Sequence, residues 1–255
     1  MTASLAAAWA EDRTTFGAWV TARSESAVEV LARAGYDYIG IDCQHSLLTE
    51  SDAGALLAPL VAAGIPSAVR VSRNDPALIG RVADAGADVV IVPLVDTPEQ
   101  AGAAVAACRY PPSGVRSFGP FRATLGLDPT ALEARISCFV MVESALALDN
   151  LDAICATPGL AGVYVGPGDL SISMGTSWLL RPRPEAVTGA IARVPAACRR
   201  AGVVPGMHVG SGPLAAELVA GGFRLVTLTS DVGLLGGAAA RDLAAARDAA
   251  AAPPG

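Results

Sequence analysis

Short runs of apolar and β-branched residues recur along the chain, and Ala- and Leu-rich segments with helical spacing separate most of them. Near-continuous apolar strands indicate burial on both faces, which is typical of parallel sheets covered by helices. Several of the intervening segments end in glycine just before the next run, as helix C-termini often do. The pattern predicts strands at residues 16–20, 38–42, 67–71, 89–93, 138–143, 162–166, 203–207 and 224–228.

Eight strand–helix units predict a (β/α)8 barrel, the TIM barrel, in which the strands close into a ring and the helices surround it. The length of 255 residues fits one such barrel. Because no Ser/Gly linker, charge run or change of composition marks a boundary, we expect residues 1–255 to form a single domain. A doubly wound open sheet is the alternative fold for the same order of elements.

Charge and composition narrow the classes of partner. The net charge is −6 and no basic patch is present, so we expect no nucleic-acid partner. No apolar run reaches the ~18 residues that a membrane span needs, and the N-terminal segment lacks the pattern of a secretory signal. Five scattered cysteines without CxxC spacing indicate buried thiols in a reducing compartment, and we expect a cytoplasmic protein.

All 18 basic residues are arginine, and the chain contains no lysine. A lysine amine is the side chain that forms a Schiff base with a carbonyl substrate or with pyridoxal phosphate. Imine chemistry on a side chain is therefore excluded, whatever carbonyl chemistry the protein performs.

Ionisable side chains gather at the carboxyl ends of the predicted strands, where barrel enzymes place their active sites. We assign no role to the last of them, the histidine that follows the seventh strand. The set consists of Asp42 and His45 after the second strand, Arg70 in the third, Glu143 closing the fifth, Asp169 after the sixth and His208 after the seventh.

Glu143 and Asp169 follow neighbouring predicted strands, so we expect their carboxylates to converge. Two carboxylates that close repel each other unless they share a proton or a cation. An oxygen-only pair that leaves positions for water and substrate suits Mg²⁺ or Mn²⁺. The glycine-rich turn at 166–171 offers backbone N–H groups for an anion beside them. The alternatives are an ion pair of Glu143 with an arginine and a helix cap formed by Asp169.

Arg70 lies in an otherwise apolar strand, where its permanent charge requires an anion. That anion is either a substrate carboxylate or a protein carboxylate, Asp42 or Glu143. An aspartate near an imidazole fixes its tautomer and raises its basicity, so Asp42 and His45 form a candidate general base. A structural, hydrogen-bonded histidine is the alternative.

Several stretches resemble the HpcH/HpaI aldolase family, whose members are metal-dependent pyruvate aldolases that cleave 4-hydroxy-2-oxo acids. The most specific stretch is GVYVGPGDLSISMG at 162–175, with Glu143 upstream, and the others are 35–45, 68–70, 92–101, 109–117 and 142–154. The resemblance implies a TIM barrel that assembles into a homotrimer or homohexamer, with the C-terminal helix exchanged between subunits. It also implies a divalent cation, Mg²⁺ or Mn²⁺ with Co²⁺ as a further option, and a small 2-oxo acid and an aldehyde as substrates.

The resemblance implies catalytic roles for four residues. Arg70 would bind the pyruvate carboxylate and the enolate oxygen. His45, held by Asp42, would act as the base. Asp84 falls where the family places an acid that reaches the site of a neighbouring subunit.

The resemblance also implies binding roles, and the chain departs from the family pattern near them. Glu143 and Asp169 would hold the metal, and the backbone N–H groups of Gly168 and Asp169 would bind the carboxylate. Gln44 replaces a glutamate common in the family, so we expect it to contact substrate without a charge. Met141 replaces a common glutamine, and the segment 177–185 replaces a Gly- and His-Pro-containing stretch.

These features predict an aldolase that reversibly cleaves a 4-hydroxy-2-oxo acid to pyruvate, or a related 2-oxo acid, and an aldehyde through a metal-stabilised enolate. The stretch 116–122 is similar to macrophomate synthase, so an oxaloacetate decarboxylase or a C–C bond-forming synthase is one alternative. A non-catalytic barrel that binds a 2-oxo acid is another. Arg109, Arg116 and Arg122 are candidates for binding a distal substrate carboxylate, with surface or subunit contacts as their alternative role.

Overall fold

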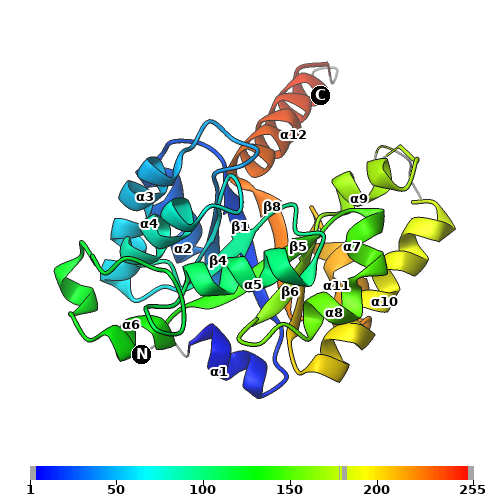
Figure 1. The fold of residues 1–255 in the computed structure, drawn as a ribbon. Coiled ribbons are helices and arrows are strands. Elements are labelled where there is room, and N and C mark those ends of the chain that lie inside the picture. The colour runs from blue at the N-terminus through cyan, green and yellow to red at the C-terminus, as the bar shows by residue number, and fades with distance from the viewer. Residues whose placement is uncertain (1–3, 178, 180–182, 252–255) are drawn as a thin grey trace.

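The computed structural model describes residues 4–177, 179 and 183–251 and contains a closed barrel of parallel strands in chain order (Figure 1). This confirms the TIM barrel and excludes the open sheet. Each predicted strand is present, with its bounds changed by three residues or fewer. The strands are β1 (Thr15–Val20), β2 (Tyr38–Asp42), β3 (Ser67–Arg70), β4 (Val89–Val92), β5 (Ser137–Val142), β6 (Gly162–Val165), β7 (Val204–His208) and β8 (Leu225–Ser230).

Helices surround the barrel and bury the outer faces of the strands (Figure 1). The strands are apolar on both faces because the inner face packs in the barrel and the outer face packs against this layer. The helices are α1 (Leu5–Ala10), α2 (Glu25–Arg33), α3 (Glu50–Ala63), α4 (Pro76–Asp84), α5 (Pro98–Ala107), α6 (Pro129–Ala134), α7 (Ala145–Asp149), α8 (Leu151–Cys155), α9 (Pro167–Ser173), α10 (Glu185–Ala201), α11 (Gly212–Ala220) and α12 (Asp231–Ala251), with a 3-10 turn η1 (Ala123–Leu125).

Local sequence signals fix where the main helices begin and end. Thr49 and Thr97 each form a capping box with the third helical residue, which satisfies backbone N–H groups at the start of α3 and α5. Gly64 and Gly202 end α3 and α10 in the left-handed conformation, with φ of 66° and 71°. Only glycine adopts this conformation without a steric cost, so the glycines before the strands were correctly interpreted as helix ends.

Aromatic rings fill the inside of the barrel. The hydroxyls of Tyr38 and Tyr164 both lie 2.7 Å from Thr227 Oγ1, which joins β2, β6 and β8 across the interior. Below them Trp9 of α1 packs edge-to-face on Phe139, with ring centroids 5.3 Å apart. The interior is therefore filled at the end where the strands begin, which leaves the carboxyl ends for a pocket.

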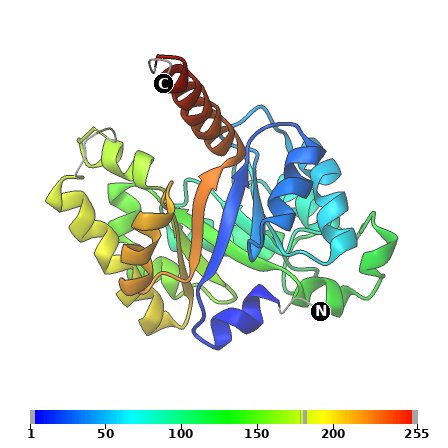
Figure 2. The ribbon, with the colours of Figure 1, turned by 180° about the vertical axis from the view of Figure 1, so that it is seen from behind.

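Helix α12 begins at the barrel and then extends away from it (Figure 2). Its first residue, Asp231, accepts hydrogen bonds from the backbone N–H groups of Thr21 and Ala22 and from the Thr21 hydroxyl. Beyond Asp231 the side chains of α12 are almost all exposed, including Leu235 at 72%. Within the described residues, no helix is long and apolar enough to cross a membrane.

The close approach of Gly40 to Trp19 predicts a strong size limit at this strand position. A Cβ atom at residue 40 would lie 2.1 Å from Trp19 Cε3 and 2.2 Å from Cζ3. We expect Gly40→Ala to lower the free energy of unfolding by about 1–3 kcal/mol because the indole must shift in a packed interior. The measurement is urea unfolding followed by circular dichroism.

The matched control is Gly189→Ala, in the middle of α10, where a Cβ atom meets nothing within 4 Å. That change should raise the free energy of unfolding by roughly 0.5–1 kcal/mol because alanine is the better helix former. Equal stability of the two variants would contradict the proposed clash.

Candidate active site

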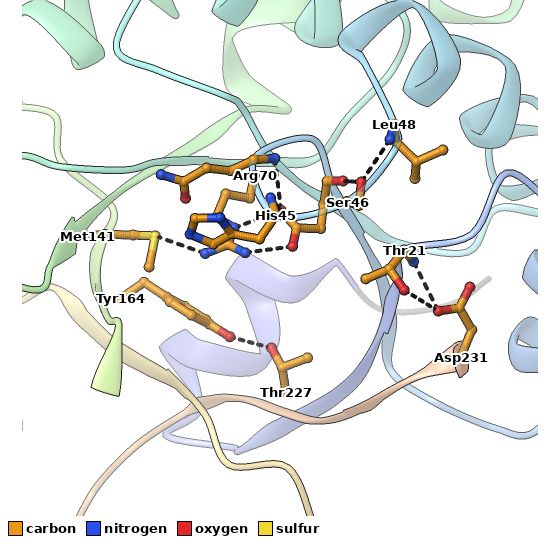
Figure 3. A network of polar contacts seen from close by, with 11 residues as sticks. Thr21, His45, Ser46, Leu48, Arg70, Met141, Tyr164, Thr227 and Asp231 are labelled. Atoms are coloured by element: carbon orange, nitrogen blue, oxygen red, sulfur yellow. Dashed lines mark hydrogen bonds and ion pairs between the residues drawn. The ribbon is translucent and has the colours of Figure 1, made fainter. Parts of the chain in front are cut away.

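A cavity of about 340 Å³ opens at the carboxyl ends of the strands. Its size is within the range of small-molecule sites. Residues from β1, β2, β3, β5, β6, β7 and β8 and from the loops that follow them line it, as predicted for a barrel enzyme. Figure 3 shows the polar contacts at its centre.

Asp42 and Arg70 form a buried ion pair on adjacent strands. Their Cα atoms are partners in the β2–β3 register. Arg70 donates from Nε to Asp42 Oδ1 at 2.9 Å and from Nη2 to Oδ2 at 2.5 Å, and the two residues are 8% and 2% exposed. Of the two protein anions considered for Arg70, Asp42 is therefore the one it pairs with.

The ion pair leaves one nitrogen of Arg70 for a ligand. Among the described residues, the printed partner of Nη1 is the Met141 sulfur at 4.0 Å, which is a weak acceptor (Figure 3). The guanidinium carbon also lies 5.7 Å from the centroid of the Trp19 ring. Burial by itself raises the pKa of the Asp42 carboxyl, but the hydrogen bonds and charge of Arg70 hold that pKa below its usual value.

His45 contacts Asp42 through its main chain. Asp42 Oδ1 accepts from the backbone N–H groups of Gln44 and His45, at 3.0 Å and 3.2 Å. No hydrogen bond between the Asp42 carboxylate and the His45 imidazole is among the contacts of the described residues, and the role of this pair as a general base stays a prediction. The Asp42 carboxylate accepts hydrogen bonds from Arg70 and from the backbone N–H groups of residues 44 and 45. The His45 side chain is exposed, and neither it nor Gln44 is among the residues that line the cavity.

Glu143 lies at the end of β5 and is only 3% exposed. Its Oε1 accepts from the backbone N–H of Leu94 at 2.7 Å, whereas Oε2 is buried with no hydrogen-bond partner among the described residues. Burial raises the pKa of this carboxyl; the Leu94 N–H opposes that rise, and the charge of Asp169 adds to it. The two carboxylates therefore lie close enough to repel each other, as predicted for neighbouring strands.

Two backbone features hold Glu143 in this position. Leu94 has φ of 55°, a left-handed conformation that costs a non-glycine residue about 1–3 kcal/mol. At Gly166 a Cβ atom would lie 2.3 Å from Glu143 Oε2, so only glycine lets the carboxylate approach. Gly166 could be recognised from the sequence as part of a turn, whereas the role of Leu94 could not, because no local pattern indicates a partner 49 residues away.

The pair can hold a divalent cation if other ligands complete its coordination. The unpartnered Glu143 Oε2 and the exposed Asp169 carboxylate offer oxygen ligands of the type that Mg²⁺ and Mn²⁺ prefer. The described residues contain no cluster of three or more His, Cys, Asp or Glu side chains that could hold a metal ion. Substrate oxygens and water would have to supply the remaining ligands.

His208, which the sequence left without a role, lies in the cavity wall at the end of β7. Burial is the main cause that lowers the pKa of its imidazole to about 4; the charges of Arg70 and Arg183 also lower this pKa, and the charge of Asp42 opposes them. The ring is therefore neutral at physiological pH. Its Nδ1 is buried without a hydrogen-bond partner among the described residues.

The three loop arginines do not lie at this cavity, so their proposed contact with a substrate carboxylate is not found within the chain. Arg109 donates to the Glu133 carbonyl, and Arg122 donates to the carbonyls of Ala85 and Gly54. Arg116 is buried beside the Tyr110 ring, with its guanidinium carbon 4.6 Å from the ring centroid. These contacts are made within the chain, and the alternative role in surface or subunit contacts stays a prediction.

Asp84 also lies away from the cavity of its own chain. It ends α4, which returns from the end of β3 to the start of β4, so it is at the opposite end of the barrel. Its carboxylate accepts from Arg116 Nη2 at 2.6 Å. Within one chain it therefore cannot reach the site, and a role in a neighbouring subunit remains a prediction. The segment 177–185 departs from the family pattern. Its residues 178 and 180–182 lie outside the described residues.

The family model for HpcH/HpaI aldolase/citrate lyase matches residues 15–238, which span the whole barrel. The chain belongs to this family. It is a lyase of the aldolase type, and the family is metal-dependent. The resemblance identified in the sequence is thereby confirmed.

Named relatives agree with this assignment. The chain is 35% identical over 243 residues to a hydroxypyruvate/pyruvate aldolase of Rhizorhabdus wittichii, covering 94% of this chain and 96% of that protein. It is 37% identical over 236 residues to a 4-hydroxy-2-oxovalerate aldolase of Rhodococcus jostii, covering 89% and 90%. The crystal structure of macrophomate synthase superposes with a TM-score of 0.85 at 27% identity, covering 96% of this chain and 88% of that one.

Proposed function

We propose that this aldolase reversibly cleaves a 4-hydroxy-2-oxo acid into pyruvate, or a closely related 2-oxo acid, and an aldehyde. The observation that carries the proposal is Glu143 Oε2, which is buried with no hydrogen-bond partner among the described residues. It lies against Gly166, which lines the cavity together with Asp169 and Arg70. The names of the relatives from Rhizorhabdus wittichii and Rhodococcus jostii support this class of substrate.

Glu143 and Asp169 would hold the divalent cation, which we propose to be Mg²⁺ or Mn²⁺, with Co²⁺ as a further option. When bound, the cation would supply positive charge that favours an enolate over its keto form. Nη1 of Arg70 would donate to the 2-oxo acid because Nε and Nη2 are already committed to Asp42. The backbone N–H groups of Gly168 and Asp169, in the first turn of α9, would donate to the C1 carboxylate.

We propose His45 as the group that moves the proton. Its imidazole would accept the proton of the C4 hydroxyl as the C3–C4 bond breaks, and the bond electrons would form the enolate of pyruvate. The proton would then return to C3 to complete the product. The turn that Asp42 makes with the backbone of residues 44 and 45 positions this loop, and Gln44 beside it would contact the aldehyde without adding charge.

Metal removal gives the first test. Incubation with EDTA, or the change Glu143→Gln, should lower the kcat for pyruvate release from a 4-hydroxy-2-oxo acid by at least about 10²–10³, because the developing enolate loses its stabilising charge. Added Mg²⁺ or Mn²⁺ should restore the chelated protein but not the variant. A lactate dehydrogenase-coupled assay measures the rate.

Glu185→Gln is the matched control, since Glu185 is exposed at the start of α10, outside the residues that line the cavity. Its activity should equal that of the unchanged protein. Full activity of Glu143→Gln in EDTA would refute the proposed metal site.

The role of His45 gives a second test. We expect His45→Ala to lower kcat by about 10²–10⁴, with little change in the free energy of unfolding because the side chain is exposed. The lactate dehydrogenase-coupled assay measures kcat, and an unchanged kcat would mean that another group carries the proton.

Likeness to macrophomate synthase favours one second candidate, a decarboxylation or C–C bond-forming reaction through the same enolate. A substrate panel separates the two. Release of CO₂ from oxaloacetate well above the release of pyruvate from aldol substrates would favour this candidate.

We also propose that the chain forms a homo-oligomer, a trimer or hexamer, in which α12 packs on a neighbouring subunit. Val232, Leu234 and Leu235 on α12 and Val30 on α2 are exposed and line one apolar groove. In such an assembly Asp84 would act at a neighbour's site.

Leu235→Asp should reduce the mass measured by light scattering, because a charge in a buried contact between subunits is unfavourable. Leu146→Asp, the same change at another exposed leucine, on α7, is the control and should leave the mass unchanged. A monomeric unchanged protein would contradict the proposal.

A further inference from the structure

His208 lies in the cavity wall at the end of β7, and the proposed cleavage gives it no role. That cleavage also leaves one reacting atom without a hydrogen-bond donor, namely the oxygen on C4, which becomes the carbonyl oxygen of the aldehyde. Negative charge develops on this oxygen as its proton leaves. A donor that is already aimed at the oxygen would stabilise this charge.

The strand order places His208 close to the proposed carboxylate pair. In the closed barrel β6 lies between β7 and β5, and Glu143 directly follows β5. The β6–β7 register pairs Val165 with Met207, so the next residues along the two strands, Gly166 and His208, are neighbours. A Cβ atom at Gly166 would lie 2.3 Å from Glu143 Oε2. One strand position therefore separates His208 from this oxygen.

The same order assigns the rest of the substrate to the side of the cavity that contains His208. The 2-oxo acid is proposed to lie between Arg70 on β3 and the carboxylates that follow β5 and β6. Its remaining atoms would then lie over the ends of β7, β8, β1 and β2. C4 is only two bonds from C2, so its oxygen stays near the carboxylates. Of the cavity side chains on strands, His208 is the first beyond them.

One ring nitrogen of His208 is free to bind a ligand. Nδ1 is buried without a hydrogen-bond partner, whereas Nε2 is accessible and also has no partner among the described residues. The imidazole is neutral because burial lowers its pKa, so one nitrogen carries the proton and the other is bare. A buried N–H without an acceptor is rarer in proteins than an acceptor without a donor. We therefore assign the proton to Nε2.

The chemistry of a neutral imidazole suits a hydrogen bond to a developing alkoxide. A neutral N–H is a weak acid, so it stabilises the charge and keeps its own proton. A purely structural role would instead need a protein partner for a ring nitrogen, and none is found for either nitrogen among the described residues.

We propose that His208 is a further catalytic residue, which donates a hydrogen bond from Nε2 to the oxygen on C4. In the condensation direction, C3 of the enolate forms the bond to the aldehyde carbon and the π electrons of the carbonyl move to its oxygen. The imidazolium of His45 then returns the proton to that oxygen, while His208 holds it in place. This inference rests on the proposed aldol chemistry.

The test compares two reactions of the same enolate with Mg²⁺ or Mn²⁺ present. Exchange of the pyruvate methyl protons in D₂O needs the enolate but no aldehyde, whereas condensation of pyruvate with acetaldehyde also develops charge on the C4 oxygen. NMR measures both rates. We expect His208→Leu to lower the kcat of condensation by about 10²–10³, the usual effect of removing one such donor, and to leave exchange unchanged.

Two variants serve as controls. His208→Gln keeps an N–H donor and should recover most of the condensation rate. Met207→Leu changes the preceding residue, which is buried outside the cavity lining, and should leave both rates unchanged. If circular dichroism shows that His208→Leu does not fold, His208→Met, which also lacks a donor, takes its place.

Three results would overturn the role of His208: an unchanged kcat of condensation in the variant without a donor, an equal loss of exchange and condensation, or a glutamine variant no faster than the leucine variant. The proposed function fails in a different way. If the unchanged protein catalyses neither exchange nor condensation, the enolate chemistry itself is refuted, and the role of His208 with it.

Discussion

The buried ion pair between Asp42 and Arg70 is the interaction on which the site depends. It joins two adjacent strand ends, aims one guanidinium nitrogen into the cavity and anchors the turn that carries Gln44 and His45. Removing either partner would leave an uncompensated buried charge, which costs several kcal/mol. The pair thus couples the stability of the barrel rim to the position of the groups proposed to act on the substrate.

The carboxylates of Glu143 and Asp169 are a source of negative charge near the same cavity. Glu143 is buried with one oxygen unpartnered, beside a second carboxylate, and its surroundings raise its pKa. The charge of Arg70 offsets only part of this rise, and its guanidinium donates its hydrogen bonds to Asp42. A region that holds excess negative charge in a confined space favours a cation, and the family is metal-dependent. The paired side chains of Asp42 and Arg70 therefore have a different role from Glu143, whose Oε2 has no hydrogen-bond partner among the described residues.

The strands and the cavity could be predicted because apolar runs and terminal polar residues are local signals. The placement of Glu143 and Asp169 after neighbouring strands followed from strand order alone. The partner of the Asp42 carboxylate could not be predicted. Arg70 and the His45 imidazole were both candidates, and the sequence does not give the distances that decide between them. The loop arginines were misplaced because nothing in residues 108–122 shows that the chain passes to the other end of the barrel. Leu94 was missed because its backbone conformation depends on a distant side chain.

The left-handed backbone conformation of Leu94 is linked to the charge of Glu143. Its N–H binds most strongly to an ionised Glu143, so the charge on that carboxyl offsets the torsional cost. Neutralising the carboxyl would weaken the hold and favour relaxation of the segment between β4 and α5. The NMR resonance of the Leu94 backbone amide would therefore show whether the Glu143 carboxyl is ionised.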